Sequence, residues 1–366
     1  MLDFVPIKYY YDIYHHFMLF MCLVAFFHTL VLKPIEPKTF SFNRIAALFL
    51  LITLLTYIGF RPIHGIFIDM TTYAHIFQRY LNGTYVIDSD YGFSYFLLFC
   101  TKTMTIEMFF FVCACIYIIP LYIASRNWFP KHYFFAFLLF VGSFSFWAYG
   151  VNGIRNGMAT SLFVLAISYY KKNTALMVLF FLLSCSFHTS MLLPIAAFCC
   201  TFFVTDTKKY YFFYILSIAL SISMGGIWEN IFASIGFGDD RFSTYLTSAN
   251  SSTNKFASTG FRYDFLIYSA APIILSRYYK YVSGYKSVIY DHILHTYIIA
   301  NGFWIMIIRA NFSNRFAYLS WFLMAVVVIY PLLDKNIWTN QFKKIGYVIL
   351  IYYAFTYGMF MYYAFK

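Results

Sequence analysis

Charged residues are scarce in this sequence. Asp, Glu, Lys and Arg make up 11% of its 366 residues, whereas a soluble domain needs about 25% to cover its surface. Hydrophobic residues make up 62% and aromatic residues 24%. This composition excludes an ordinary soluble domain and predicts an integral membrane protein, with many Tyr and Trp side chains at the membrane interfaces.

The sequence also lacks the motifs of several common chemistries. No GxxxxGK[ST] or GxGxxG pattern occurs, which excludes the usual nucleotide-binding loops. No HExxH or Cys/His ligand spacing occurs, so we expect no metal and no cofactor. None of the seven cysteines forms a CxxC, and we interpret them as small core residues. The basic residues behind the net charge of +12 are scattered between apolar runs, which favours membrane lipid and excludes nucleic acid.

Long apolar runs recur along the chain, and a hydrocarbon core of about 30 Å needs about 17–25 apolar residues per helix. The stretch 174–204 is too long for one crossing and is divided at 187–190. The segment 91–101 is too short to cross, so we expect a re-entrant or interfacial helix there. The sequence predicts one all-α polytopic membrane domain over 1–366, a helix bundle of about twelve transmembrane helices. The predicted transmembrane helices are 17–32, 45–60, 106–123, 133–149, 157–170, 174–187, 189–204, 210–228, 264–279, 288–308, 316–332 and 345–362.

The distribution of Lys and Arg predicts the orientation, because basic residues concentrate in short inside loops. With the amino terminus outside, most of the 26 Lys and Arg residues fall in such loops, and most acidic residues fall outside. Two outside regions are long, at 61–105 and 229–263. Because every inside loop is short, we expect the chemistry on the outer, periplasmic face.

Arginines on the predicted outer face are the first site candidates, because the topology rule disfavours them there. Arg155 and Arg315 each lie where a predicted helix begins at that face, and helix N-termini favour anions. Asn152 precedes the first of these helices and Arg309 the second. Since arginine matches phosphate oxygens with a fork of donors, the pattern predicts a diphosphate site. The alternative is that these arginines only reach lipid headgroups.

Other outer residues are candidates for binding or proton transfer. Arg61 follows the second predicted helix, and Asp69 and Tyr73 lie four residues apart on one helical face. Asp69 could act as a general base for a hydroxyl, or could simply pair with Arg61. His188 sits at a turn between two apolar helices, where it could act in catalysis or be structural. Arg241 follows two acids in the second outer loop, which are expected to be solvated rather than metal ligands.

Charged residues are nearly absent from the middle of the apolar runs, and the two halves show no evident repeat. Ion-coupled transporters generally need ionisable groups within the membrane. The sequence therefore weighs against a coupled transporter.

Five short patterns, taken in order, resemble the EpsG family of bacterial Wzy-type O-antigen and exopolysaccharide polymerases. Two positions depart mildly, with Asn156 where Gln is common and Asp90 where Glu is common. The patterns are Arg61…Gly65…Asp69…Tyr73, Asp90-Tyr91-Gly92-Phe93, Asn152…Arg155…Ala159 followed by Lys171-Lys172, Phe187-His188-Thr189-Ser190 and Arg315-Phe316-Ala317-Tyr318.

The resemblance implies a glycosyltransferase in the bacterial inner membrane. It would transfer a growing glycan from undecaprenyl pyrophosphate to a repeat unit on the same lipid carrier, at the periplasmic face. The lipid-linked oligosaccharide is then the expected partner, with a chain-length regulator protein as a further candidate. Asp69 or His188 would be the base, and the expected ligands of the lipid pyrophosphate and glycan are Arg61, Tyr73, Asn152, Arg155, Arg241, Arg309 and Arg315. A flippase or exporter of lipid-linked oligosaccharide and a membrane acyltransferase for surface glycans remain alternatives.

Overall fold

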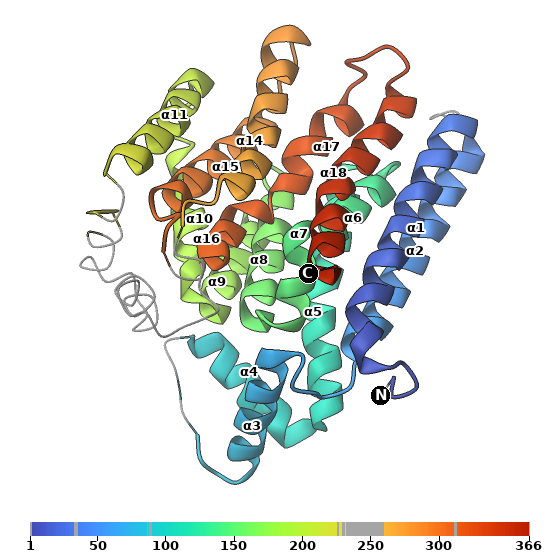
Figure 1. The fold of residues 1–366 in the computed structure, drawn as a ribbon, viewed down its shortest axis with the longest axis vertical. Helices are drawn as coiled ribbons and strands as arrows, with labels where there is room; N and C mark the ends of the chain where they lie inside the picture. The colour runs from blue at the N-terminus through green and yellow to red at the C-terminus, as the bar shows by residue number, and fades with distance from the viewer. Residues whose placement is uncertain are drawn as a thin grey trace. The chain divides into compact units, whose positions relative to one another are not determined.

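The computed structural model describes residues 2–32, 36–85, 87, 90–224, 227–228, 231, 260–310 and 313–365. Throughout these residues the regular secondary structure is helical, without a strand, which confirms the all-α prediction (Figure 1). The chain divides into two compact units, Met1–His188 with Ile329–Lys366 and Thr189–Val328. Each unit is described by itself.

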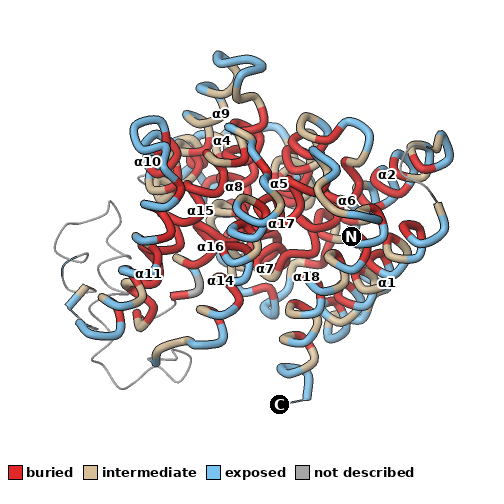
Figure 2. Tube along the Cα trace, turned by 90° about the horizontal axis from the view of Figure 1, so that it is seen from above, coloured by how far each residue is buried: buried red, intermediate tan, exposed pale blue. Residues whose placement is uncertain are grey.

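The first unit is built around α8, which lies between α5 and α9. The long helices α1 and α18 pack along each other, and α2 packs along α5. Buried residues follow α6 and α8, whereas α1 and α2 expose one side (Figure 2). The helices of this unit are α1 (Tyr10–Val31), α2 (Pro37–Gly59), α3 (Ile68–Leu81), α4 (Tyr91–Thr103), α5 (Ile106–Trp128), α6 (Tyr133–Val141), α7 (Phe144–Val151), α8 (Ile154–Ser168), α9 (Thr174–Phe187) and α18 (Gln341–Ala364).

Side-chain bonds to carbonyl oxygens lock the first unit together. The Tyr117 hydroxyl of α5 donates to Phe146 O of α7 at 2.9 Å. The Ser184 hydroxyl of α9 donates to Ala159 O of α8 at 2.7 Å. Small residues line α8, and four of them, Ala159, Ser161, Ala166 and Ser168, are buried. Small side chains let neighbouring helices approach closely.

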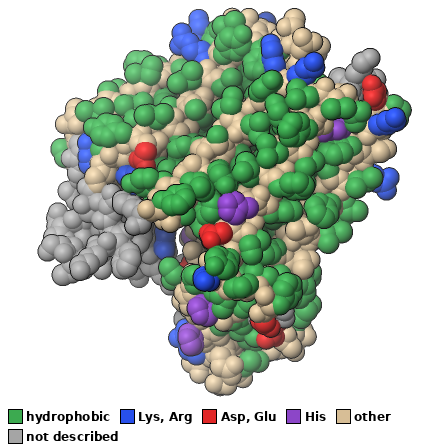
Figure 3. Space-filling view, turned by 45° about the vertical axis from the view of Figure 1, so that its right-hand side comes forward, with side chains coloured by type: hydrophobic (Ala, Val, Ile, Leu, Met, Phe, Trp, Pro, Cys, Tyr) green, Lys and Arg blue, Asp and Glu red, His purple; other side chains and the backbone are tan. Residues whose placement is uncertain are grey.

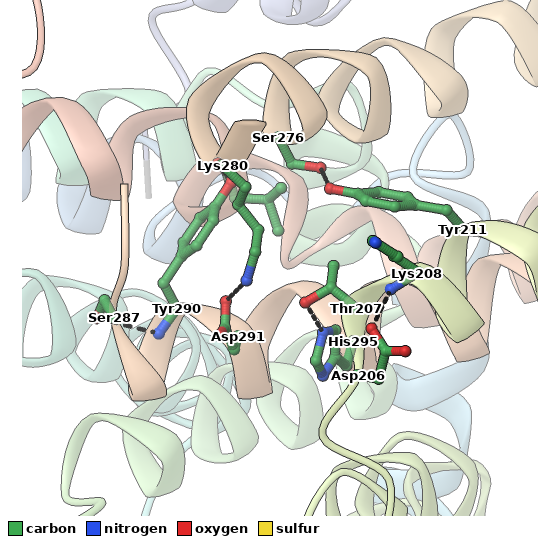
Figure 4. Close-up of polar contacts among 11 residues, drawn as sticks. Asp206, Thr207, Lys208, Tyr211, Ser276, Lys280, Ser287, Tyr290, Asp291 and His295 are labelled. Atoms are coloured by element: carbon green, nitrogen blue, oxygen red, sulfur yellow. Dashed lines mark hydrogen bonds and ion pairs between the residues drawn. The ribbon is translucent and has the colours of Figure 1, made fainter. Parts of the chain in front are cut away.

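The second unit is built around α15, which contacts α10, α11, α14 and α16. Figure 4 shows a group of polar contacts within this unit. Lys280 pairs with Asp291, the Tyr211 hydroxyl lies 2.9 Å from Ser276 Oγ, and His295 Nε2 lies 3.0 Å from Thr207 Oγ1. These contacts join η4 to α15, α11 to α14 and α11 to α15. The helices of this unit are α10 (Leu192–Cys200), α11 (Thr207–Met224), α14 (Tyr263–Arg277), the π-helix η4 (Tyr278–Val282), α15 (Val288–Met306), α16 (Ser313–Trp321) and the start of α17 (Met324–Asp334).

Several helices are long and apolar enough to cross a membrane. Among the described residues there are five, and a sixth if the bent pair α6–α7 is one span. Figure 3 shows a broad hydrophobic surface on the face in view. The prediction of a membrane protein is therefore supported, but the count of about twelve spans is not confirmed. The five are Ile7–Val31, Pro37–Gly59, Ile106–Trp128, Arg315–Asp334 and Gln341–Ala364.

Short helices explain part of the difference in span number. α8 has 15 residues, which is about 22 Å of helix and less than a hydrocarbon core of about 30 Å. α9 has 14 residues and α10 has 9. These segments are helical where the sequence predicts helices, but their length alone does not take them across a bilayer.

The boundaries of the helices agree with the predicted ones at some positions and differ at others. The break predicted at 187–190 is confirmed, because α9 ends at Phe187 and a short 3₁₀ turn, Thr189–Met191, precedes α10. The single helix predicted over 133–149 is wrong: α6 and α7 meet at Gly142 and Ser143 with a bend of 66°. The span predicted over 316–332 is present as Arg315–Asp334, although a short interruption divides it into α16 and α17.

The seven cysteines are free thiols. Cys22, Cys100 and Cys113 are buried, as predicted for small core residues. Cys199 and Cys200 are exposed, contrary to that prediction, because the end of α10 turns them away from the core of the second unit.

Candidate functional site

The Arg155 side chain lies at the centre of the candidate site in the first unit. It is in the first turn of α8, as the sequence predicts. Its Nη1 atom lies 2.8 Å from Asp90 Oδ2, and its Nε donates to the Tyr73 hydroxyl at 3.2 Å. The guanidinium also lies 5.5 Å from the centroid of the Phe93 ring. Residues from α3, α4 and α8 therefore fix one cation in place.

Asp90 reaches Arg155 because of how α4 begins. Asp90 occupies the N-cap position of α4, where a carboxylate normally accepts a hydrogen bond from the helix, but its side chain makes no such bond. Gly92 brings the helix against α9, since a Cβ at this position would lie 2.3 Å from Ser186 Oγ. The first turn of α4 is thus held close to α9, with the Asp90 carboxylate turned to Arg155.

Tyr73 and Asp69 lie one turn apart on α3, as predicted. Tyr73 is buried, and burial raises the pKa of its hydroxyl, which the Asp69 charge raises further and the Arg155 charge lowers. The phenol therefore stays protonated at neutral pH and accepts the hydrogen bond from Arg155. Asp69 is half-buried and close enough to Tyr73 for its charge to be felt.

His188 ends α9, next to the same group of aromatic rings. Its backbone N–H donates to Ser184 O at 3.2 Å. The preceding residue, Phe187, packs against Phe93 and Phe96 of α4, with ring centroids 6.5 Å and 5.6 Å away. His188 itself is half-buried in the turn that follows α9.

Asn152 occupies the turn between α7 and α8. Its Oδ1 atom is buried and makes no hydrogen bond to any described residue. The nearby glycines serve close packing within the protein: a Cβ on Gly157 would lie 2.7 Å from Tyr149 O. The close backbone approach near Arg155 is therefore between α7 and α8.

Arg61 is fully buried, with 1% of its surface exposed. It donates to Ile58 O at the end of α2 and, at 3.4 Å, to Val151 O at the end of α7. Cations are favoured at helix C-termini, and Arg61 makes these contacts in place of the alternative ion pair with Asp69. Burial lowers the pKa of the guanidinium to about 10, so it remains charged at neutral pH.

Of the remaining predicted arginines, Arg309 and Arg315 belong to the second unit. Arg309, in the second unit, donates to Ser221 O at 2.6 Å and lies 4.9 Å from the Phe261 ring centroid. Arg315 is exposed in the first turn of α16. Arg241 lies outside the described residues. Among the described residues, no group of three or more His, Cys, Asp or Glu side chains could hold a metal ion.

The structure thus brings Arg155, Tyr73 and Asp69 together, with Asn152 and His188 on adjoining turns. Sequence reasoning did not select Asp90 as a site residue. The available signal was its place in the Asp90-Tyr91-Gly92-Phe93 pattern, and the ion pair itself depends on the packing of α4.

These features define a helical membrane protein with an arginine fixed at the start of a buried helix. The chain belongs to the EpsG family, whose model matches residues 44–366. This is a polysaccharide polymerase-like family of bacterial membrane proteins. No curated protein and no solved structure matches the chain.

Proposed function

We propose that this protein is a membrane glycosyltransferase that polymerises lipid-linked glycan repeat units. It transfers the growing glycan from undecaprenyl pyrophosphate to a repeat unit on a second lipid carrier, at the periplasmic face of the bacterial inner membrane. Membership of the EpsG family supports a polymerase-type protein. The Arg155 group supports a site for the diphosphate of the donor.

The observation that carries this proposal is the position of Arg155. A cation in the first turn of a helix is electrostatically unfavourable, because the helix N-terminus is itself positive. Yet the Arg155 side chain is only 13% exposed there and is held by Asp90 and Tyr73. An arginine fixed beside a helix N-terminus gives a diphosphate both a matched fork of donors and a favourable dipole.

The reaction requires charge stabilisation and one proton transfer. The acceptor hydroxyl attacks the anomeric carbon of the donor glycan, and the bond from that carbon to the diphosphate oxygen breaks. Negative charge gathers on the departing diphosphate, where preorganised donors such as Arg155 lower the barrier. The hydroxyl proton passes to a base, and the lipid pyrophosphate leaves.

Asp69 and His188 are the candidates for that base. Asp69 lies one turn from Tyr73 and therefore close to Arg155. His188 follows Phe187, whose ring contacts the same helix that carries Asp90. If Asp69→Asn is inactive while His188→Ala keeps activity, Asp69 is the base; the reverse pattern assigns His188.

The test is a gel of surface glycan from the native host, with the gene deleted and then restored. A ladder that collapses to a single repeat unit and returns on restoration is the expected result. Loss of even the single repeat would instead support a flippase, and an unchanged ladder would support an acyltransferase. Restoration with an Arg155→Ala gene should leave the single repeat, in membranes shown by immunoblot to contain the variant protein.

A further inference from the structure

We propose that Asp90 is the positioning residue of this site: its carboxylate holds the Arg155 guanidinium in the orientation that receives the diphosphate. This inference rests on the function proposed above. Nothing in the pattern of arginines along the sequence points to an acidic residue in this role. The case comes from burial, from the start of α4 and from the contacts around the guanidinium.

Burial comes first. The Asp90 side chain is 5% exposed and that of Arg155 13%, at a separation of 2.8 Å. A buried ion pair of this kind constrains both partners, because either charge alone is costly in a medium of low dielectric constant. The guanidinium is therefore held to the carboxylate and does not swing toward solvent.

The start of α4 supplies the second argument. Asp90 sits where it could cap its own helix, yet it makes no capping bond and gives its carboxylate to a residue of another helix. An N-cap bond typically contributes about 1 kcal/mol. The geometry of the Asp90 side chain thus serves Arg155 at the expense of local helix stability.

The contacts around the guanidinium supply the third argument. The Asp90 carboxylate pairs with Nη1 of Arg155, and the Tyr73 hydroxyl accepts a hydrogen bond from its Nε. The Phe93 ring centroid lies 5.5 Å from the guanidinium carbon. Tyr73 and Phe93 also contact each other edge to face, with ring centroids 5.5 Å apart. Together these side chains form a receptor for a guanidinium group, in which Asp90 provides a negative charge in direct contact.

Chemical rescue tests this receptor directly. In Arg155→Ala, added guanidinium ion should enter the space left by the side chain, pair with Asp90 and restore part of the polymerisation rate. The rescue should raise the rate of the variant at least tenfold at millimolar guanidinium chloride, with potassium chloride at equal concentration as the control. In the double variant Arg155→Ala/Asp90→Asn, the rescue should disappear.

The double variant is chosen because it should fold. Replacing Asp90 alone leaves Arg155 buried without its partner, whereas the double variant removes both charges. Its folding is checked by size-exclusion chromatography of the purified protein. Arg155→Ala/Asp90→Glu keeps the carboxylate and should recover part of the rescue, which a general loss of packing would not do. A matched control is Arg155→Ala/Asp264→Asn, which removes a carboxylate of the second unit and should keep the full rescue.

The outcomes separate this inference from the proposed function. Equal rescue with and without the Asp90 carboxylate would overturn the positioning role while the function stands. Failure of guanidinium to rescue a folded Arg155→Ala protein would also overturn it. Full activity of Arg155→Ala without guanidinium would instead remove Arg155 from the mechanism, whereas absence of polymerisation by the unaltered protein would overturn the proposed function.

Discussion

Two Arg–Asp pairs in this protein both have short nitrogen–oxygen distances but lie in different surroundings. In the first unit, Arg155 and Asp90 come from different helices, meet at 2.8 Å and are 13% and 5% exposed. In the second unit, Arg262 and Asp264 are two residues apart at the start of α14, meet at 2.6 Å and are 24% and 43% exposed. The shorter distance belongs to the more exposed and purely local pair.

The difference shows that distance alone does not measure the contribution of an ion pair. An exposed pair is weakened by water and salt, and its neighbours in sequence would be close in any case. A buried pair between helices is formed only when the helices pack, and each charge depends on the other. The Arg155–Asp90 pair therefore reports tertiary structure at the candidate site, whereas Arg262–Asp264 reports the local chain.

The largest expected effect is the loss of stability in Asp90→Asn. This variant leaves the Arg155 charge buried without a carboxylate, which should cost about 3–5 kcal/mol of folding free energy. Thermal unfolding of the purified protein in detergent would show it as a large fall in midpoint. The matched variant Asp264→Asn should cost about 0–1 kcal/mol. Equal midpoints for the two variants would mean that the pairs do not differ as their burial indicates.

Arg155→Ala should have the next largest effect, on activity. Removing one preorganised donor from a site of charge development lowers turnover by about 100- to 1,000-fold. The measurement is the rate of chain elongation in membranes that contain equal amounts of each variant. Arg262→Ala, at the exposed pair, should elongate at the rate of the unaltered protein. Arg155→Lys should remain slow, because a point charge does not replace the planar fork; recovery of the full rate in Arg155→Lys would contradict the fork.

The fold was predictable where the signal was local. The predicted break at 187–190 contains polar residues between two apolar runs, and α9 ends there in the structure. Gly142 and Ser143 are also a local signal for a bend, but the prediction of a single helix followed the length of the apolar run around them. The division of α16 from α17 falls at Phe322 and Leu323, which are apolar and buried, so it depends on packing that the local sequence does not reveal.

The site was predictable in part for the same reason. Arg155 stood out because a cation is unusual at a helix start that the sequence predicts to face outward. Asp90 did not stand out as a site residue, because an acidic residue directly before an apolar helix is typical of an N-cap. Arg61 was expected to bind substrate, but the structure buries it against the carbonyl ends of α2 and α7. Its position depends on where two distant helices end, and sequence spacing does not show that.

Gly92→Ala should have an intermediate effect, by moving Asp90 without altering any charge. The new methyl group would overlap Ser186, including its backbone oxygen at 2.8 Å. Overpacking of this kind costs about 1–3 kcal/mol and shifts the backbone. Both the unfolding midpoint and the elongation rate should fall. Gly65→Ala is the control, since a Cβ there meets nothing within 4 Å, and a loss of the same size in that variant would refute the packing argument.

Tyr73→Phe should have the smallest effect, because it removes one contact and keeps the ring. The Arg155 Nε loses its acceptor at 3.2 Å, while the ion pair to Asp90 remains. A hydrogen bond to a charged group contributes about 1.5 kcal/mol or slightly more, which corresponds to about a tenfold lower elongation rate. Tyr95→Phe, at an exposed position on α4, should elongate normally. If Tyr73→Phe were as slow as Arg155→Ala, the phenol rather than the ion pair would control the guanidinium, and the contrast between the two Arg–Asp pairs would no longer explain the site.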